Sequence, residues 1–189
     1  MTVASPEPAR SHQPLFRFCP ACGGTQVEWL SAKEMRCRGC RFTFFLNAAA
    51  AVGVVIEAAG KILLAVRGSD PERGRLDLPG GFLEPGEDAE QGLRREVREE
   101  LRLELPSLRL LGTHPNTYPW GGITYATLDL IFHTMLPVIP EVVPGDDVRA
   151  VEWHDLDGFD RELLAFPSGR ALLGRFLAER ALQGPGSTV

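Results

Sequence analysis

Apolar residues along this chain occur in short runs that are separated by glycine- and proline-containing turns, a pattern typical of strands. The turn Ala59-Gly60 splits two such runs and predicts a hairpin. The segment HPNTYPWGGI lies between two further runs and is expected to join them as a loop. The predicted strands are residues 52–57, 61–67, 108–113, 124–134 and 148–154.

Two segments have a helical pattern instead. Residues 76–82 are expected to form a short strand that enters a glycine loop, followed by the turn Pro85-Gly86 and an acidic helix that ends near residue 101. Glu87 or Asp88 can cap the start of this helix. Residues 167–182 form an amphipathic helix with a proline near its start, and residues 160–166 a short helix before it. Strands with a central and a terminal helix predict an α/β domain.

The acidic helix carries the strongest chemical signal. Glu96, Glu99 and Glu100 are three and four residues apart, so they share one helix face. Three carboxylates this close repel one another unless a cation lies between them, and a hard divalent ion such as Mg²⁺ or Mn²⁺ prefers oxygen ligands. The alternative is a solvated face laced with i,i+4 ion pairs. The preceding strand and glycine loop favour the metal site, and such ions commonly bind substrate phosphates.

This region resembles the signature of the Nudix hydrolases. Eight signature positions are in register: Gly81, Glu87, Arg95, Glu96, Val97, Glu99, Glu100 and Leu103. Arg102 departs from the pattern, because the family has glycine there. That position follows the helix end and favours a left-handed backbone, so Arg102 affects the cap and no metal ligand.

The resemblance implies a Nudix α/β/α sandwich with a mixed sheet. It also implies metal-dependent hydrolysis of a nucleoside diphosphate linked to a second group, X, with release of AMP. Glu96, Glu99, Glu100 and the carbonyl of Gly80 would be the Mg²⁺ or Mn²⁺ ligands, and Glu96 or Glu99 could also act as a general base. Arg95 would pair with Glu87 and orient the helix. A late loop supplies a base or further ligand in the family, and its acidic residues here are Glu141, Asp146 and Asp147, of which Asp147 is the first candidate.

Four cysteines form two CxxC pairs, Cys19/Cys22 and Cys37/Cys40, with residues 23–36 between them. Paired knuckles at this spacing predict a tetrahedral Zn²⁺ site, and four thiolates make it a closed, structural one. The alternatives are two disulfides or a redox pair, and the lack of a secretory pattern disfavours a disulfide framework. Basic and aromatic residues of this zinc ribbon could stack bases, but packing within so small a module is favoured.

A zinc ribbon before a Nudix domain resembles the NADH pyrophosphatase branch, which includes removal of NAD caps from RNA. The Ser-Gln-Pro-Trp motif of that branch does not occur here, and NADH, ADP-ribose and FAD are all retained as substrates. Five residues are candidates for substrate binding: Arg67 and Arg75, which could clasp phosphates, and Tyr118, Trp120 and Tyr125, which could stack on a base. Solvated charges and strand packing are the alternatives. A nucleotide sensor without catalysis is the competing class, and the complete set of glutamates favours an enzyme.

Composition sets the remaining expectations. The chain has 189 residues and a formal net charge of −5, which disfavours nucleic acid as a partner without excluding it. No apolar run is long enough for a membrane span, so we expect a cytoplasmic protein. The expected organisation is a disordered lead (1–15), a zinc ribbon (16–46), a Nudix domain (47–184) and a frayed tail (185–189). The resemblance also implies a homodimer.

Overall fold

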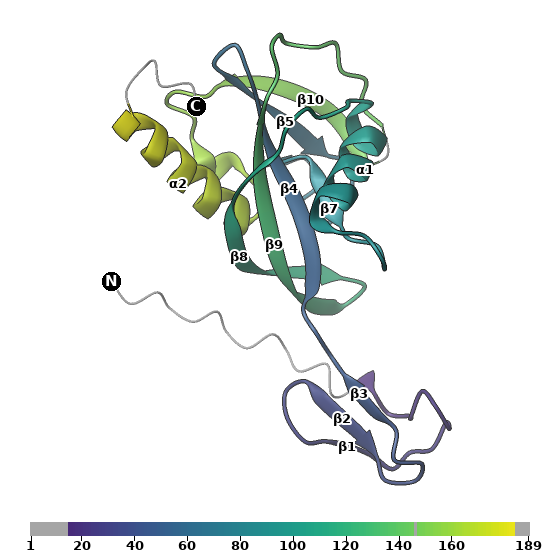
Figure 1. Cartoon of the computed structure of the whole chain (residues 1–189). Helices are drawn as coiled ribbons and strands as arrows, with labels where there is room; N and C mark the ends of the chain where they lie inside the picture. The colour runs from purple at the N-terminus through teal and green to yellow at the C-terminus, as the bar shows by residue number, and fades with distance from the viewer. Residues whose placement is uncertain (1–14, 146, 184–189) are drawn as a thin grey trace. The chain divides into compact units, whose positions relative to one another are not determined.

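The computed structural model describes residues 15–145 and 147–183 (Figure 1). The chain divides into two compact units. The first takes the residues up to 48 together with 117–126, and the second takes 49–116 and the residues from 127 onward. Each unit is built around its own sheet.

A three-stranded antiparallel sheet forms most of the first unit, with strand order β1-β2-β3. Its strands are β1 (Val27–Trp29), β2 (Glu34–Cys37) and β3 (Thr43–Phe45). The ring of Phe16 lies 5.4 Å from that of Trp29 and 5.6 Å from that of Phe44, and Met35 is fully buried. A hairpin of β1 and β2 thus begins between the two CxxC pairs, and β3 extends it.

The second unit is built on a seven-stranded mixed sheet whose main path has the order β10-β5-β4-β9-β8. Strands β4 and β9 run parallel, with Val54 opposite Phe132, whereas β4 and β5 form the antiparallel hairpin expected around Ala59-Gly60. The short strands β6 and β7 pair with β5 and β4. The strands are β4 (Ala49–Ala58), β5 (Lys61–Arg67), β6 (Leu76–Asp77), β7 (Gly80–Phe82), β8 (Arg109–Trp120), β9 (Ile123–Met135) and β10 (Val148–Asp155).

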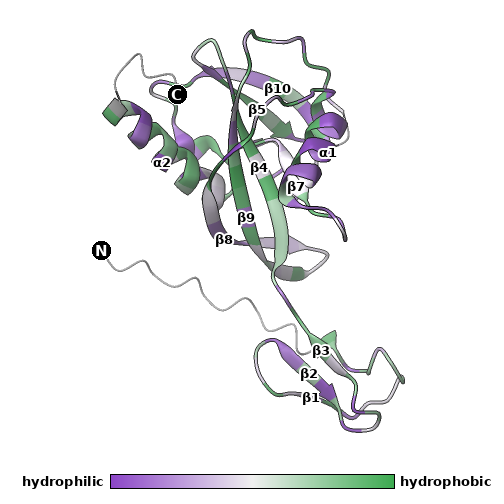
Figure 2. Cartoon of the chain, in the orientation of Figure 1, coloured by the Kyte–Doolittle hydropathy of each residue, from purple (hydrophilic) through white to green (hydrophobic). Residues whose placement is uncertain are grey.

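One helix packs on each face of this sheet, because β4 is apolar on both faces. Leu93, Val97 and Leu101 of α1 (Ala89–Leu101) pack with alternate residues of β4 such as Val54. Residues of α2 (Pro167–Gln183) and the turn before it pack with the other set, which includes Val55. Figure 2 shows the apolar β4 between the two helices. The expected α/β/α sandwich with a mixed sheet is confirmed.

Both ends of α1 have specific caps. Asp88 is the N-cap, and its carboxylate accepts from the N–H of Gln91 while the Gln91 side chain accepts from the N–H of Asp88, which is a reciprocal capping box. At the other end Arg102 has a left-handed backbone (φ 56°), and its N–H donates to the carbonyl of Arg98. The left-handed backbone that the family's glycine favours at this position is therefore kept by Arg102.

Strands β8 and β9 are longer than the sequence pattern predicts. The segment HPNTYPWGGI was expected to be a loop, but β8 continues to Trp120 and β9 starts at Ile123, so the turn is Gly121-Gly122. Prolines are tolerated here because β8 is the last strand in the described order of the sheet. The N–H groups on the outer side of such an edge strand form no hydrogen bonds with a neighbouring strand, so a proline there costs the sheet no bond. The short helix predicted before α2 is a 3-10 turn, η2 (Arg161–Leu163).

A polar network joins β8, β9 and the start of α2 on the α2 face of the sheet. The buried carboxylate of Asp129 accepts hydrogen bonds from Thr127 (2.7 Å), Ser168 (2.5 Å) and Asn116 (2.8 Å). A buried charge with this many donors is well satisfied, and it fixes where α2 begins.

Further along α2, Arg180 reaches a second buried carboxylate, that of Glu57 on β4 (2.8 Å), which also contacts His133 of β9 (3.2 Å). Burial lowers the pKa of His133 despite this carboxylate.

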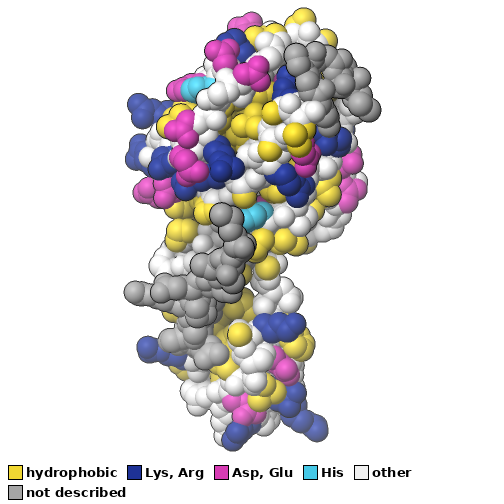
Figure 3. All heavy atoms as spheres, turned by 90° about the vertical axis from the view of Figure 1, so that its left-hand side faces the viewer, with side chains coloured by type: hydrophobic (Ala, Val, Ile, Leu, Met, Phe, Trp, Pro, Cys, Tyr) yellow, Lys and Arg dark blue, Asp and Glu magenta, His cyan; other side chains and the backbone are white. Residues whose placement is uncertain are grey.

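Within the described residues no helix is long and apolar enough to cross a membrane. On the face of this unit drawn in Figure 3, basic and acidic side chains are interspersed.

Candidate active site

Arg95 organises the acidic residues of α1. Its guanidinium pairs with Glu87 (2.7 Å), Glu96 (2.9 Å) and Glu99 (3.1 Å), and it donates to the carbonyl of Phe82 on β7. The predicted Arg95–Glu87 pair is present. Arg95 therefore joins the start of the helix, its acidic face and the glycine loop through one planar group.

The ion pairs of Arg95 shift the pKa values of Glu87 and of Arg95 itself. The hydrogen bond from Arg95 and that from the N–H of Glu84 hold the pKa of Glu87 down at about 2. The pKa of Arg95 is raised, first by Glu87 and then by Glu96 and Glu99. Glu96 is nearly buried whereas Glu99 is half exposed, so Glu99 is the glutamate of this pair that solvent reaches most readily.

The glycine loop comes very close to the helix at Gly81. A Cβ atom built on Gly81 would lie 2.6 Å from the carboxyl carbon of Glu96, so no larger residue fits while Glu96 keeps this position. A larger residue at this signature position would have to displace the Glu96 carboxylate.

Glu100 is buried at the base of the same corner. Its carboxylate accepts from the N–H of Gly80 (2.9 Å), the residue predicted to offer a carbonyl to the metal. Burial raises the pKa of Glu100 to about 9, and the charges of Asp147, Glu96 and Asp77 add to the effect while the Gly80 N–H opposes it. Glu100 is therefore a carboxyl group whose ionisation is costly without a nearby cation.

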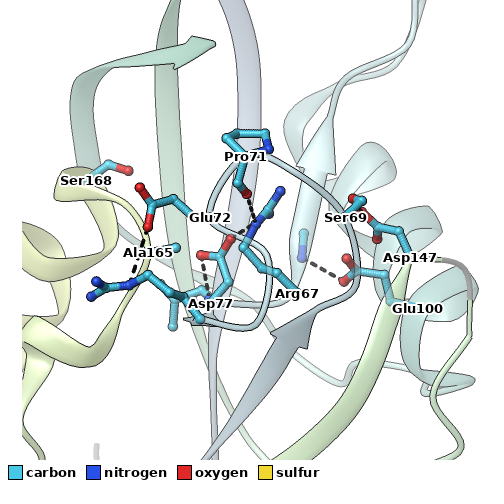
Figure 4. Close-up of polar contacts among 12 residues, drawn as sticks. Arg67, Ser69, Pro71, Glu72, Asp77, Glu100, Asp147, Ala165 and Ser168 are labelled. Carbon is cyan, nitrogen blue, oxygen red and sulfur yellow. Dashed lines mark hydrogen bonds and ion pairs between the residues drawn. The ribbon is translucent and has the colours of Figure 1, made fainter. Parts of the chain in front are cut away.

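Asp147 faces this corner from the other side. It lies next to Glu100 in Figure 4, in agreement with the charge effect of Asp147 on the pKa of Glu100. Its carboxylate accepts from the hydroxyl of Ser69 (3.0 Å), and its carbonyl accepts from the N–H of Gly68 (2.7 Å). Asp146 lies outside the described residues, and Glu141 is an exposed loop residue.

Arg67 and Arg75, predicted to clasp phosphates, have protein partners. Arg67 pairs with Asp77 (3.0 Å) and donates to the carbonyl of Pro71 (Figure 4). Its guanidinium also lies over the ring of Phe166. Arg75 donates to the carbonyls of Glu162 and Leu164. Both side chains therefore hold the loop 68–75 in place, and their contact with substrate stays a prediction.

The three aromatic candidates lie at the end of the β8–β9 hairpin, in the first unit. Trp120 and Tyr125 are exposed and Tyr118 is partly buried. Their predicted stacking on a base stays a prediction.

The cysteines form a compact ligand set. The sulfur atoms of Cys19, Cys22, Cys37 and Cys40 all lie within 4.8 Å of one another. Within the described residues, these four cysteines form the cluster whose ligand atoms are close enough to share a metal ion. None of the four is in a disulfide. Burial raises the pKa of Cys19, but hydrogen bonds from the N–H groups of Cys22 and Ala21 outweigh it and bring that pKa to about 7. Four soft donors in this arrangement fit a tetrahedral zinc ion.

Two contacts at the site were missed at the sequence level. Ser69, which was assigned no role, donates a hydrogen bond to Asp147. Asp77, which was assigned no role, pairs with Arg67, and burial raises its pKa to about 6 against the effect of Arg67. No local pattern reveals either contact, although both residues flank segments that had been singled out.

Comparison with known proteins agrees with this geometry. Residues 47–174 match the model of the NUDIX domain. The chain is 37% identical over 130 residues to the ADP-ribose pyrophosphatase of Methanocaldococcus jannaschii, covering 67% of this chain and 72% of that protein. It is 30% identical over 173 residues to the NAD-capped RNA hydrolase NudC of Pseudomonas entomophila, covering 90% of this chain and 56% of that protein.

Among solved structures, the chain is similar to a NUDIX hydrolase from Nitrosomonas europaea, with a TM-score of 0.69 and 25% identity. The match covers 91% of this chain and 96% of that one, so it includes more than the domain matched by the family model. By contrast, this chain spans only a little over half the length of the NudC relative.

Proposed function

The chain belongs to the Nudix family, and from this membership we propose that it is a metal-dependent hydrolase of nucleoside diphosphates linked to a group X. The substrate class that we propose is an ADP-containing diphosphate, and the products are AMP and the phosphorylated second group. The activity belongs to the class that acts on phosphoric anhydride bonds.

The observation that carries this proposal is the acidic corner at the meeting point of β7 and α1. Glu96, Glu99 and Glu100 are present there with the Gly80 backbone, and Asp147 faces them. Their donor atoms are hard oxygens, which suit Mg²⁺ or Mn²⁺ and not a soft metal. In this structure Arg95 engages Glu96 and Glu99, so these carboxylates would divide their oxygens between Arg95 and the ion.

A divalent ion bound here would neutralise the diphosphate oxygens and lower the pKa of a bound water. In the proposed hydrolysis a water would add to one phosphorus, the bond from that phosphorus to the bridging oxygen would break, and one proton of the water would pass to a carboxylate of this chain. We assign this proton to Asp147 first, because it is exposed and its carboxylate faces the corner. Arg95 holds the helix against the glycine loop while these events occur.

The choice of substrate rests on the relatives. One is named for ADP-ribose and another for NAD-capped RNA, and ADP is the part that both names have in common chemically. ADP-ribose and NADH are therefore placed before FAD. Arg67, Arg75, Tyr118, Trp120 and Tyr125 remain the proposed contacts to the phosphates and the base.

The test is release of AMP from a panel of ADP-ribose, NADH, NAD, FAD and nucleoside triphosphates with Mg²⁺ or Mn²⁺. We expect Glu99→Gln and Glu100→Gln each to lower kcat by at least about 100-fold. Glu90→Gln is the matched control, because Glu90 is an exposed glutamate of the same helix outside the corner. Nucleotide binding with no turnover of any compound would contradict the proposal and favour a sensor.

Removal of an NAD cap from RNA is the second candidate. It is supported by the NudC relative from Pseudomonas entomophila, because that match covers 90% of this chain. Basic side chains of the ribbon, among them Arg36 and Arg38, are exposed and available to phosphates, although each also pairs with a glutamate. We expect the capped RNA to outperform free NAD only at low salt if these charges contribute. A ratio of kcat/KM values that does not change with salt would contradict this reading.

For the ribbon we propose one structural Zn²⁺ bound by Cys19, Cys22, Cys37 and Cys40. Thiolate ligands need a compartment that keeps cysteines reduced, so we also propose a cytoplasmic location. Native mass spectrometry checks the ion and its stoichiometry of one per chain.

We further propose a homodimer, supported by the exposed aromatic side chains Phe18 and Phe45 of the ribbon. Sedimentation at micromolar concentration measures the mass, and a monomer there would contradict this proposal.

A further inference from the structure

Asp147 is an exposed residue just before β10, and in the described part of the chain its carboxylate accepts a hydrogen bond from the hydroxyl of Ser69. We propose that Ser69 is a positioning residue, which holds the Asp147 carboxylate toward Glu100 in the orientation that the hydrolytic step requires. This inference rests on the role of Asp147 in the proposed function and adds a residue that the Nudix signature does not include.

The backbone around Asp147 is fixed from two directions. On one side the N–H of Gly145 donates to the carbonyl of Glu100 (2.7 Å), which ties the loop to the end of α1. On the other side the N–H of Gly68 donates to the carbonyl of Asp147 (2.7 Å), which ties it to the end of β5. The Cα atom of Asp147 is therefore held between the acidic helix and the loop 68–75.

The contact with β5 is too close for any residue but glycine. A Cβ atom on Gly68 would lie 2.2 Å from the carbonyl oxygen of Asp147. Ser69 follows Gly68 directly in the chain. The backbone contact of Gly68 therefore also places the Ser69 hydroxyl next to the Asp147 side chain. A register shift between Val148 and Ala150 in the pairing of β10 with β5 starts at this point, which places Asp147 just before the regular ladder.

The fixed backbone leaves the side chain of Asp147 free to choose among its rotamers, because the residue is exposed. One of these rotamers turns the carboxylate toward Glu100, as Figure 4 shows. The Ser69 hydroxyl, which donates to the Asp147 carboxylate at 3.0 Å, selects that rotamer. An exposed hydrogen bond of this kind contributes little to folding, so its effect falls on orientation.

The experiment compares Ser69→Thr with Ser69→Val, two variants of the same shape of which only the first retains a hydroxyl. We expect the valine variant to lower kcat about tenfold with KM unchanged, and the threonine variant to retain most of the activity. In the Asp147→Asn background the valine substitution should cost nothing further, because the two residues act as a unit. Equal activity of the Thr and Val variants, or losses that multiply in the double variant, would overturn the proposal.

A second readout does not depend on turnover. In the metal-free protein, NMR couplings about χ1 of Asp147 should report one rotamer in the wild type and in Ser69→Thr, and averaging in Ser69→Val. Averaging already in the wild type would overturn the inference even if the enzyme is active. A single rotamer in a protein that hydrolyses nothing would instead leave the positioning contact intact and contradict the proposed function.

Discussion

Arg102 shows how a single residue can depart from a family pattern while the backbone keeps the conformation that the pattern requires. It follows the last residue of α1 with φ 56°, and a left-handed backbone costs a non-glycine residue about 1–2 kcal/mol. The backbone N–H of Arg102 donates to the carbonyl of Arg98 and caps the helix end. This hydrogen bond offsets part of the strain of the left-handed backbone.

We predict that Arg102→Gly stabilises the protein by about 0.5–1 kcal/mol, because glycine adopts this backbone without the clash of its Cβ atom. Urea unfolding measures the change. Arg102→Ala is the matched control, since it removes the same side chain but keeps the Cβ atom, and it should give no gain. Stabilisation by alanine as large as that by glycine would assign the effect to the side chain instead.

Glu87 leads to a prediction about pH. Its pKa is about 2 in the folded protein against an ordinary value of 4.5, because Arg95 stabilises the carboxylate. A depressed folded-state pKa contributes stability above pH 4.5 that is lost as the pH falls toward 2. Glu87→Gln should therefore lower Tm at pH 7, and the difference from the wild type should narrow between about pH 4.5 and pH 2. A difference that stays constant across this window would exclude the ion pair as its cause.

Contacts close in the sequence could be predicted, and distant ones could not. The Arg95–Glu87 pair, which the family resemblance implied, is present, and of the two candidate caps Glu87 and Asp88 the structure uses Asp88. The bond from Ser69 to Asp147 joins residues 78 positions apart and depends on the register of β10 against β5, which no local pattern contains. The partner of Arg67 in the structure, Asp77, was not foreseen either, although it lies only ten residues along the chain.

At the scale of elements, the start of α2 depends on Asp129 of β9. Ser168 in the first turn of α2 and Asn116 of β8 both donate to this buried carboxylate. The network therefore joins the start of α2 to two strands through side-chain hydrogen bonds. The apolar contacts of α2 begin one turn later, at Leu172 and Leu173.

We predict that Asp129→Asn destabilises the protein by about 2 kcal/mol or more, since an amide NH₂ would replace an acceptor that faces donors. Thermal unfolding of the variant measures this. The control is Asp155→Asn, which removes an exposed ion pair with Lys61 and should change stability by less than about 0.5 kcal/mol. Equal effects of the two substitutions would show that the network contributes no more than a surface pair.

The extents of strands were harder to predict than their existence. The strands β5 and β10 lie within one residue of the predicted ranges, whereas β4 begins three residues before the predicted start at residue 52. For β8 the prolines at 115 and 119 pointed to a loop, but the strand continues through both. What decides the outcome is the position of β8 in the strand order, which is a property of the whole sheet.

At the scale of the molecule, the cysteine pairs and the acidic helix predicted two modules, and each of the two units has its own sheet. The inclusion of residues 117–126 in the unit of the ribbon was not foreseen, because these residues are far from the ribbon in sequence.

We predict that a strong zinc chelator unfolds the ribbon while the larger unit remains folded. The ribbon has three short strands and, among its described residues, few buried side chains, so the proposed Zn²⁺ would contribute most of its stability. In an amide NMR spectrum the signals of residues 19–45 should collapse, while those of β4 and β5 keep their positions. Collapse of both sets together would show that the two units unfold as one.

The place of β8 at the end of the described strand order also bears on how copies of the protein can associate. Pro115 and Pro119 are four residues apart, so in a strand of period two their nitrogen atoms point the same way. Neither nitrogen carries a hydrogen to donate, and a strand from another molecule would meet two gaps in the ladder it tried to form. This outer strand therefore resists growth of the sheet into a fibre at high protein concentration, and a dimer, if it forms, is expected to use side chains of the surface and not backbone pairing along this stretch.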